Sequence, residues 1–335
     1  MSQFHTFLFE GLPVRGAIVR LDEAWQQVQS RRASNSETGA YPPPVRALLG
    51  QMLAAGVLMQ SGLKFNGALI LQVQGDGPVK LAVAEVRSDL GLRATATLQG
   101  DAASLGADPA ANLGALVNVG GAGRCAITLD PHNRQPGQQP YQGIVPLSDA
   151  QGQALTSLSA ALEHYMRQSE QLDTTVVLAA NDHTAAGLLV QRMPLKGEGN
   201  LAANLGEAEE ADRLGHNEDY NRIAHLAASL TEQELLTLDV ETILHRLFWE
   251  EKLLRFVPVP QHALVPHFAC ACSRERVAAM LRNLGEQELQ SILSERPHIE
   301  VGCEFCGQQY QFDPVDAAQL FTAPLQQPPS SQAVQ

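Results

Sequence analysis

The sequence predicts an α+β fold: an N-terminal domain of packed β-sheets with flanking helices, a helical linker, and a small C-terminal Cys₄ zinc domain. Three observations support this prediction. Strand patterns come in runs early in the chain, with helical segments grouped between them. A helical pattern follows a polar stretch that ends near residue 217, and four cysteines form two close pairs near the C-terminus. We expect the N-terminal domain at residues 1–193, the linker at 194–255, the zinc domain at 256–322 and a disordered tail at 323–335.

In the first domain, segments with strand propensity are bounded by turn residues. Helices are expected over 23–31, over 149–168 and over 45–63, and the last is apolar nearly all round, which predicts burial on several sides. The Gly-Asp-Gly sequence at 75–77 predicts a hairpin turn rather than a phosphate loop, because neither a Lys-Ser/Thr pair nor a helix start follows it. The expected strands are Thr6–Phe9, Val14–Arg20, Leu63–Gly67, Ala68–Val73, Val79–Val86, Leu92–Leu98, Arg124–Leu129, Tyr141–Pro146, Thr174–Ala179 and Ala186–Gln191.

The linker changes character along its length. Residues 196–217 are rich in Gly, Asn and Glu and predict a flexible, solvated segment. Thr231 and Glu234 have the spacing of a capping box, and Asp239 can cap a further helix. The apolar residues of that further helix recur at helical spacing, and a helix this short needs docking for stability. The apolar face consists of Val240, Ile243, Leu244, Leu247 and Phe248.

The C-terminal part predicts a small unit of helices and one hairpin. Ser273 can cap a helix that Gly285 ends, and a second helix is expected over 286–294. Short strands at 299–301 and 310–312 would flank the second cysteine pair. Pro314 then suits the first position of a last helix.

Cys270, Cys272, Cys303 and Cys306 predict a tetrahedral site for one Zn²⁺ ion. Each pair supplies two thiolates from one short turn, and Gly307 lets the backbone turn inward toward the sulfurs. Zinc binding is worth about 10–16 kcal/mol in small zinc peptides, so metal binding and folding of this unit form one equilibrium. Oxidants attack thiolates, and the neighbouring sulfurs of each pair can form two local disulfides, which hold zinc poorly.

Spacing alone leaves a static zinc ribbon and a redox switch open. A catalytic zinc is disfavoured, because four cysteines close the coordination sphere. The sequence has no His-Glu-x-x-His, Gly-x-Ser-x-Gly, P-loop or dinucleotide motif, and no thioredoxin-like setting surrounds Cys-x-x-Cys, so we expect no enzyme. His267 and His298 are close to the cysteines in sequence and are expected not to be ligands. Cys125 lies in a predicted strand, where a small buried apolar role is expected.

Composition and charge exclude further classes. A net charge of −13 argues against nucleic acid as the main partner, because that affinity comes from clustered Lys and Arg. The apolar segment at 45–63 is interrupted by Arg46 and Gln51, so no membrane span is expected. The N-terminus shows no signal peptide, and five cysteines then predict a reducing cytoplasmic location.

Seven stretches, which run in order along nearly the whole chain, carry a resemblance to a known family. They are Val14-Arg-Gly16, Leu63-Lys-Phe65, Gln74-Gly-Asp-Gly-Pro78, Tyr141-Gln-Gly143, Ser169-Glu-Gln-Leu172, Cys270-Ala-Cys-Ser-Arg-Glu-Arg276 and Cys303-Glu-Phe-Cys-Gly307. In these stretches the chain resembles the heat-shock protein 33 family of redox-regulated bacterial chaperones. It departs from the family in the Glu-rich 197–216 segment, which looks longer than usual, and Cys125 lies outside the family signature.

The resemblance implies an ATP-independent holdase. The reduced protein would be inactive and would bind one zinc through the four cysteines. Peroxide with mild heat, or hypochlorous acid, would form the Cys270–Cys272 and Cys303–Cys306 disulfides and release zinc. The zinc domain and the linker would then unfold, and a homodimer of the N-terminal domain would bind unfolding client proteins. The apolar face of the linker is the expected client surface, covered while zinc is bound and exposed afterwards.

Overall fold

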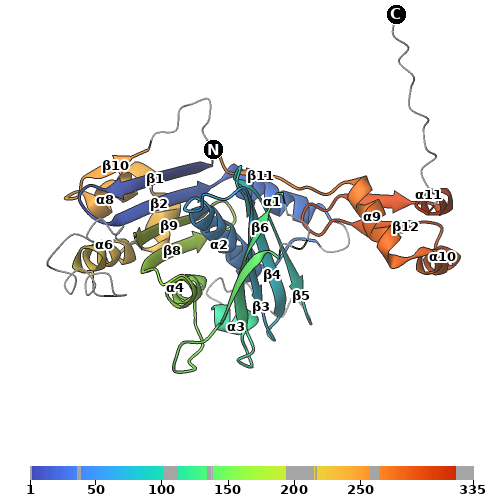
Figure 1. Cartoon of the computed structure of the whole chain (residues 1–335), viewed down its shortest axis with the longest axis horizontal. Coiled ribbons are helices and arrows are strands. Elements are labelled where there is room, and N and C mark those ends of the chain that lie inside the picture. The colour runs from blue at the N-terminus through green and yellow to red at the C-terminus, as the bar shows by residue number, and fades with distance from the viewer. Residues whose placement is uncertain are drawn as a thin grey trace, which may run out of the picture. The chain divides into compact units, whose positions relative to one another are not determined.

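The computed structural model describes residues 2–35, 39–100, 112–133, 137, 139–193, 215, 217–256 and 264–321. They divide into two compact units, Met1–Cys270 and Ala271–Gln335 (Figure 1). The predictions for the Glu-rich segment at 197–216, apart from Gly215, and for the tail at 323–335 lie outside the described residues. Among the helices that are described, none combines the length and the apolar character needed to span a membrane.

The first unit contains two sheets. In one, five strands run in the order β10-β1-β2-β9-β8, and in the other, six strands run in the order β11-β5-β4-β3-β6-β7. All strand pairs are antiparallel except β11 with β5, which is parallel. The five-stranded sheet consists of β1 (Gln3–Phe9), β2 (Val14–Leu21), β8 (Thr174–Ala180), β9 (Ala185–Arg192) and β10 (Leu253–Arg255). The six-stranded sheet consists of β3 (Gly67–Gln74), β4 (Val79–Arg87), β5 (Gly91–Leu98), β6 (Arg124–Pro131), β7 (Tyr141–Pro146) and β11 (His267–Phe268). Nine of the ten predicted strands are confirmed, and so is the hairpin turn between β3 and β4. The strand expected at 63–67 is wrong: the amides of Gly62 and Leu63 donate back to the last turn of the preceding helix, and the chain extends into β3 only from Gly67.

Helix α2 (Pro43–Gln60) lies between the two sheets and contacts strands of both (Figure 1). Buried residues on all its sides confirm the prediction from its apolar sequence. The helix begins at Pro43, inside the proline run, because a proline in the first turn lacks only an amide that has no intrahelical partner there.

Three further helices flank this core: α1 (Glu23–Ala33), α3 (Leu113–Val117) and α4 (Leu158–Ser169). The start expected for α4 at residue 149 is wrong. The Asp149 carboxylate accepts hydrogen bonds from the backbone amides of Gln151 and Gln153, so this stretch forms a turn. The helix begins only after Ser157, whose hydroxyl caps it.

Helices α6 (Glu218–Ala228), α7 (Glu232–Thr237) and α8 (Val240–Phe248) cover the opposite face of the five-stranded sheet. Helices cover both faces of this sheet, because successive residues of a strand point to opposite faces. In β2, Val19 packs with α2 in one apolar cluster, and Ile18 packs with the linker helices in another. The predicted capping box of Thr231 and Glu234 is confirmed, and Asp239 caps α8. The short strand β10, which follows α8, was not predicted.

The second unit follows its prediction closely. It contains α9 (Arg274–Leu284), α10 (Glu286–Glu295), β12 (Ile299–Gly302), β13 (Gln309–Phe312) and α11 (Pro314–Gln319). Ser273 caps α9, and Gly285 follows it with a φ of 94°, a conformation that glycine adopts without strain. Its apolar cluster has five buried members: Leu281, Leu289, Ile299, Phe312 and Ala317.

Candidate metal centre

The four predicted cysteines come together. The Sγ atoms of Cys270, Cys272, Cys303 and Cys306 all lie within 4.8 Å of one another, and those of Cys272 and Cys306 are 3.3 Å apart. Zinc–sulfur bonds of about 2.3 Å in a tetrahedron would set the sulfurs roughly 3.8 Å apart. The donor set and its spacing therefore fit a closed tetrahedral zinc site.

The second pair is positioned by the hairpin β12–β13. The Cys303 amide donates to the Gln308 carbonyl oxygen at 2.9 Å, and the Gly307 amide donates to the Cys303 carbonyl oxygen at 2.8 Å. Gly307 has a φ of 70°, which favours glycine, so the residue allows the turn that brings both sulfurs to one side. Cys306 is buried and Cys303 is half-buried.

The first pair lies between a strand and a helix. Strand β11 ends two residues before Cys270, and the Ala269 amide donates to the Leu92 carbonyl oxygen at 3.0 Å. On the other side, Cys272 directly precedes the N-cap residue of α9, where the helix dipole favours negative charge. The first pair is therefore held between a hydrogen-bonded strand and the start of a helix.

Two further side chains lie beside the sulfurs. The Arg93 guanidinium lies 3.7 Å from the Cys270 Sγ through its Nη1 and pairs with Glu85 at 2.5 Å. A hydrogen bond to Cys272 raises the pKa of the Tyr310 phenol, which thus stays a donor. A cation and a hydrogen-bond donor thus lie beside the sulfurs of Cys270 and Cys272. Sequence reasoning missed Arg93 because it reaches Cys270 from a distant strand, and it missed Tyr310 because no pattern shows that this side chain contacts Cys272.

His267, His298 and Cys125 are not part of the four-cysteine cluster. His298 Nε2 is 2.8 Å from the Glu300 carboxylate, and His267 Nδ1 is 3.0 Å from the Val265 carbonyl oxygen. Cys125 is buried in β6, and this burial raises the pKa of its thiol to about 12. The prediction that Cys125 is a small buried residue is confirmed.

Comparison with known proteins identifies the family. The family model described as Hsp33 protein matches residues 2–313. The chain belongs to the Hsp33 family. The 33 kDa chaperonin of Chromobacterium violaceum is 46% identical over 320 residues, which cover 96% of this chain and 94% of that protein. The 33 kDa chaperonin of Methylobacillus flagellatus is 41% identical over 329 residues, covering 98% and 97%. This Hsp33 chain is therefore a chaperone whose C-terminal cysteine cluster can hold a metal ion.

A solved structure supports the fold of the family. The crystal structure of the 33 kDa chaperonin from Thermotoga maritima matches with a TM-score of 0.67 at 20% identity, covering 95% of this chain and 97% of that one. The α+β fold predicted from the sequence is thus confirmed.

In this Hsp33 chain the apolar linker face is buried against the five-stranded sheet. Its five residues, Val240, Ile243, Leu244, Leu247 and Phe248, are each at most 4% exposed. The Phe248 ring packs on Phe9 and Phe7, with ring centroids 5.0 and 6.2 Å apart. The structure therefore brings the proposed client-binding residues together, but under the linker backbone and away from solvent.

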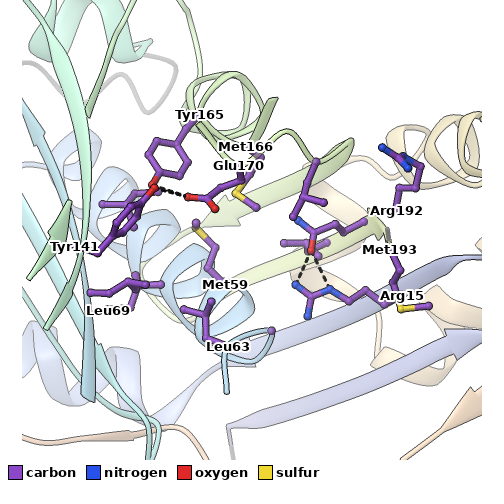
Figure 2. A pocket seen from close by; sticks show the side chains of 16 residues that line it. Arg15, Met59, Leu63, Leu69, Tyr141, Tyr165, Met166, Glu170, Arg192 and Met193 are labelled. Atoms are coloured by element: carbon purple, nitrogen blue, oxygen red, sulfur yellow. Dashed lines mark hydrogen bonds between the residues drawn. The ribbon is translucent and has the colours of Figure 1, made fainter. Parts of the chain in front are cut away.

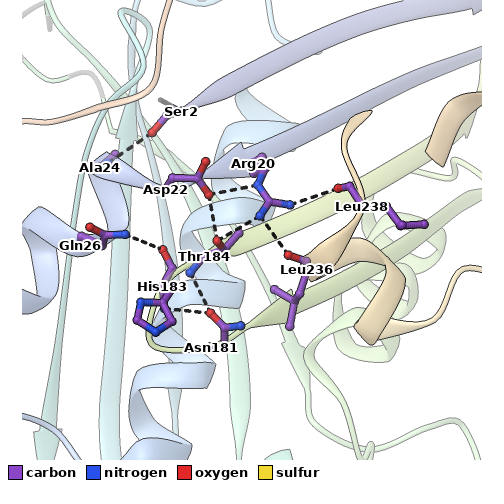
Figure 3. Close-up of polar contacts among 10 residues, drawn as sticks. All are labelled: Ser2, Arg20, Asp22, Ala24, Gln26, Asn181, His183, Thr184, Leu236 and Leu238. Carbon is purple, nitrogen blue, oxygen red and sulfur yellow. Dashed lines mark hydrogen bonds and ion pairs between the residues drawn. The ribbon is translucent and has the colours of Figure 1, made fainter. Parts of the chain in front are cut away.

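A polar contact fixes α7 beside this apolar face (Figure 3). Arg20 on β2 donates to the carbonyl oxygens of Leu236 at 2.9 Å and Leu238 at 3.2 Å, at the C-terminal end of the helix. Asp22 orients the guanidinium through an ion pair of 3.1 Å. These carbonyls lack intrahelical partners, so Arg20 acts as a cap supplied from the sheet. Its sequence signal is a charged residue in a largely apolar strand, where Arg15 is the other charged residue.

Proposed function

We propose that the protein is a redox-regulated, ATP-independent holdase, inactive when reduced and zinc-bound and activated by oxidation of the four cysteines. The observation that carries the proposal is the convergence of Cys270, Cys272, Cys303 and Cys306 in a chain whose linker buries a continuous apolar face. Bound zinc would hold the four thiolates together and supply most of the stability of the second unit, whose apolar cluster is small.

Oxidation would remove the ligands in pairs. In each pair, one thiolate attacks hydrogen peroxide to give a sulfenic acid and hydroxide. The neighbouring thiolate displaces the sulfenic oxygen as hydroxide, so two thiolates lose two electrons and one peroxide is reduced. The expected bonds are Cys270–Cys272 and Cys303–Cys306. The disulfides no longer offer thiolate ligands, so the affinity for zinc and the order of the second unit are lost together.

The described contacts suggest how this loss would reach the linker. Residues next to Cys270 form β11 on β5, a pairing of two residues only. Earlier in the chain, β10 pairs with β1, and Arg255 of β10 forms an ion pair with Glu241 of α8. Disorder that spreads back from Cys270 would first remove β11 and then these contacts, freeing the linker at 194–255.

Exposure of the apolar linker face to water would cost free energy, and a bound client can offset this cost by covering the face. Each buried Leu, Ile or Phe side chain contributes about 1.5–3 kcal/mol, so release of α8 alone is unfavourable. An unfolding protein offers apolar segments that cover the same side chains, including Phe7 and Phe9 of the sheet. Client binding and linker release would therefore stabilise each other, without ATP. The net charge of −13 would keep the open form soluble.

Three further expectations, on location, assembly and partners, complete the proposal. We expect the resting protein in the cytoplasm, where thiols are kept reduced. We also expect the oxidised protein to act as a homodimer through its N-terminal domain at 1–193. Neither nucleic acid nor membrane is an expected partner.

The proposal is tested by oxidising the reduced, zinc-loaded protein with warm peroxide. Zinc release, free thiols and aggregation of a denatured client are measured in the same samples. We expect four thiols and the zinc to be lost together, with suppression of aggregation only after oxidation. Loss of zinc without client protection would refute the holdase.

The alternative is a static zinc ribbon that serves as an interaction module. It predicts that zinc survives the oxidant, or that the reduced protein already binds its partner. The same zinc measurement therefore separates the two functions.

A further inference from the structure

A cavity of about 340 Å³ opens in the first unit, where the end of α2 meets strands of both sheets and the end of α4 (Figure 2). Four of the stretches that carry the family resemblance contribute to its wall, through Arg15, Leu63, Tyr141 and Glu170. These four residues take no part in the proposed cysteine chemistry, so that chemistry does not explain the cavity. Its volume lies at the lower end of the range of small-molecule sites.

Arg15 is the unusual feature of this cavity. Its half-buried guanidinium donates from Nε at 2.9 Å and from Nη2 at 2.6 Å, both to the Gln191 side-chain oxygen, which is neutral. Burial lowers the pKa of Arg15, and within the described residues no carboxylate pairs with it. Arg192, which also lines the cavity, is by contrast paired with Asp173 at 3.2 Å. A desolvated cation without a counter-ion is unfavourable unless a ligand supplies the negative charge.

The position of the guanidinium is built into the backbone. Gly62 lies so close that a β-carbon there would be 2.0 Å from Nη2 and 2.2 Å from Nη1 of Arg15. Any side chain at residue 62 would therefore displace the guanidinium. The glycine and Gln191 together hold the charge at the cavity wall.

Among the described residues that line the cavity, one side chain is acidic, and it is directed to other partners. The Glu170 carboxylate accepts hydrogen bonds from the Tyr141 and Tyr165 hydroxyls, each at 3.1 Å to the same oxygen. Its negative charge disfavours a second anion at that end. Between Arg15 and Glu170 the wall is apolar and includes the buried side chains of Leu69, Ile127, Met166 and Leu189.

We propose that this cavity, the Arg15 pocket, binds an organic monocarboxylate with an apolar body: the carboxylate would pair with Arg15 and the apolar body would lie on Leu69, Ile127, Met166 and Leu189. A free fatty acid of medium length and the C-terminus of a peptide that ends in leucine share this chemistry. The inference is independent of the proposed redox switch.

The test uses the reduced full-length protein and calorimetric titration with octanoate, with octan-1-ol as the uncharged match. A short peptide ending in Leu-Leu is titrated as the free acid and as the amide, which identifies the source of the carboxylate. We expect at least one acid to bind at least tenfold more tightly than its neutral match. Arg15→Gln should lower that affinity at least tenfold, whereas Arg87→Gln, at an exposed pair with Asp89, should leave it unchanged.

Methionine methyl resonances give a readout that needs no variant. Met59 and Met166 line the pocket, and their signals should shift on titration, whereas that of Met280 in the second unit should not. The proposal is overturned if neither acid binds, if acid and neutral match bind equally, if Arg15→Gln binds as the parent does, or if the pocket methionines do not respond.

Discussion

The linker helices and the second unit are stabilised in different ways. Among the described residues, the linker helices and the turn between α6 and α7 bury ten apolar side chains in one cluster with strands β1, β2, β8 and β9. The apolar cluster of the second unit has five buried members, and one of them is an alanine. Burial can therefore hold the linker in place, whereas the second unit is expected to depend on the proposed bound metal. An oxidant that acts on sulfur directly affects stability from metal binding but not stability from apolar burial. The second unit is therefore the expected sensor of oxidation.

The largest effect is expected from removing one ligand. Cys303→Ser should leave three thiolates, weaken zinc binding and unfold the second unit, because metal binding supplies about 10–16 kcal/mol in comparable peptides. Hydrogen exchange should show residues 271–321 without protection, while the amides of β2, β3 and β9 stay protected. Cys125→Ala serves as the matched control, since it removes a cysteine but no ligand. Equal zinc content and equal protection in C303S and the parent would contradict the account.

Phe248→Ala should loosen the linker while leaving the metal in place. Truncation of a buried phenylalanine costs about 3–5 kcal/mol, here in the docking of α8. Limited proteolysis of the reduced protein should then cut within residues 218–248, and the reduced variant should already suppress some client aggregation.

The neighbouring residue offers the control for this variant. Trp249 is 68% exposed at the end of the same helix, so Trp249→Ala should leave proteolysis unchanged. If both variants resist protease as the parent does, the apolar face does not hold the linker.

A smaller effect is expected at Arg20, where a polar contact supports the apolar one. Arg20→Gln removes hydrogen bonds to the C-terminal end of α7 and should cost about 1–3 kcal/mol. Arg20→Lys keeps the charge but not the forked geometry, so its effect should be intermediate. Exchange rates of the α7 amides measure both, and no change in R20Q would show that burial alone fixes this helix.

The smallest effect is expected at Cys125, which lies in neither region. Burial raises the pKa of its thiol from 9.0 to about 12, so the folded protein should leave it unmodified by iodoacetamide and by peroxide near neutral pH. Mass spectrometry should find one reduced cysteine in the oxidised protein. In a separate sample of reduced protein that is denatured before alkylation, it should find five modified cysteines. The unfolded thiol ionises above 9.0 and the folded one does not, so its contribution to stability is lost as the pH rises from 9.0 to about 12. Modification of Cys125 in the native protein would contradict this assignment.

What could be predicted from sequence differs between these regions for a physical reason. The caps at Thr231, Asp239 and Ser273 and the turn at Gly307 depend on residues a few positions apart, so they could be found by pattern. The short strand β11 could not, because its two residues are extended only through pairing with β5. The turn at Asp149 was missed because a side chain there competes with the helix for backbone amides.

The same distinction holds for the metal centre. The four ligands follow from the spacing of the cysteines, and the family resemblance adds the pairing. Arg93 contacts Cys270 from a strand that only the folded chain brings near, and no local pattern marks the contact of Tyr310 with Cys272, although Tyr310 follows the second pair in the same hairpin. The Arg15 pocket was missed likewise, because its wall joins residues from 15 to 193.

The short pairing of β11 with β5 has a practical consequence. The Ala269 amide, which donates to Leu92, belongs to the residue directly before the first ligand. A single nuclear magnetic resonance signal from this amide can thus act as a native reporter of the centre, read without a dye, a chelator or an engineered label. If this signal broadens during a slow titration with oxidant before the signals of the linker helices change, loss of the β11–β5 pairing precedes the proposed release of those helices.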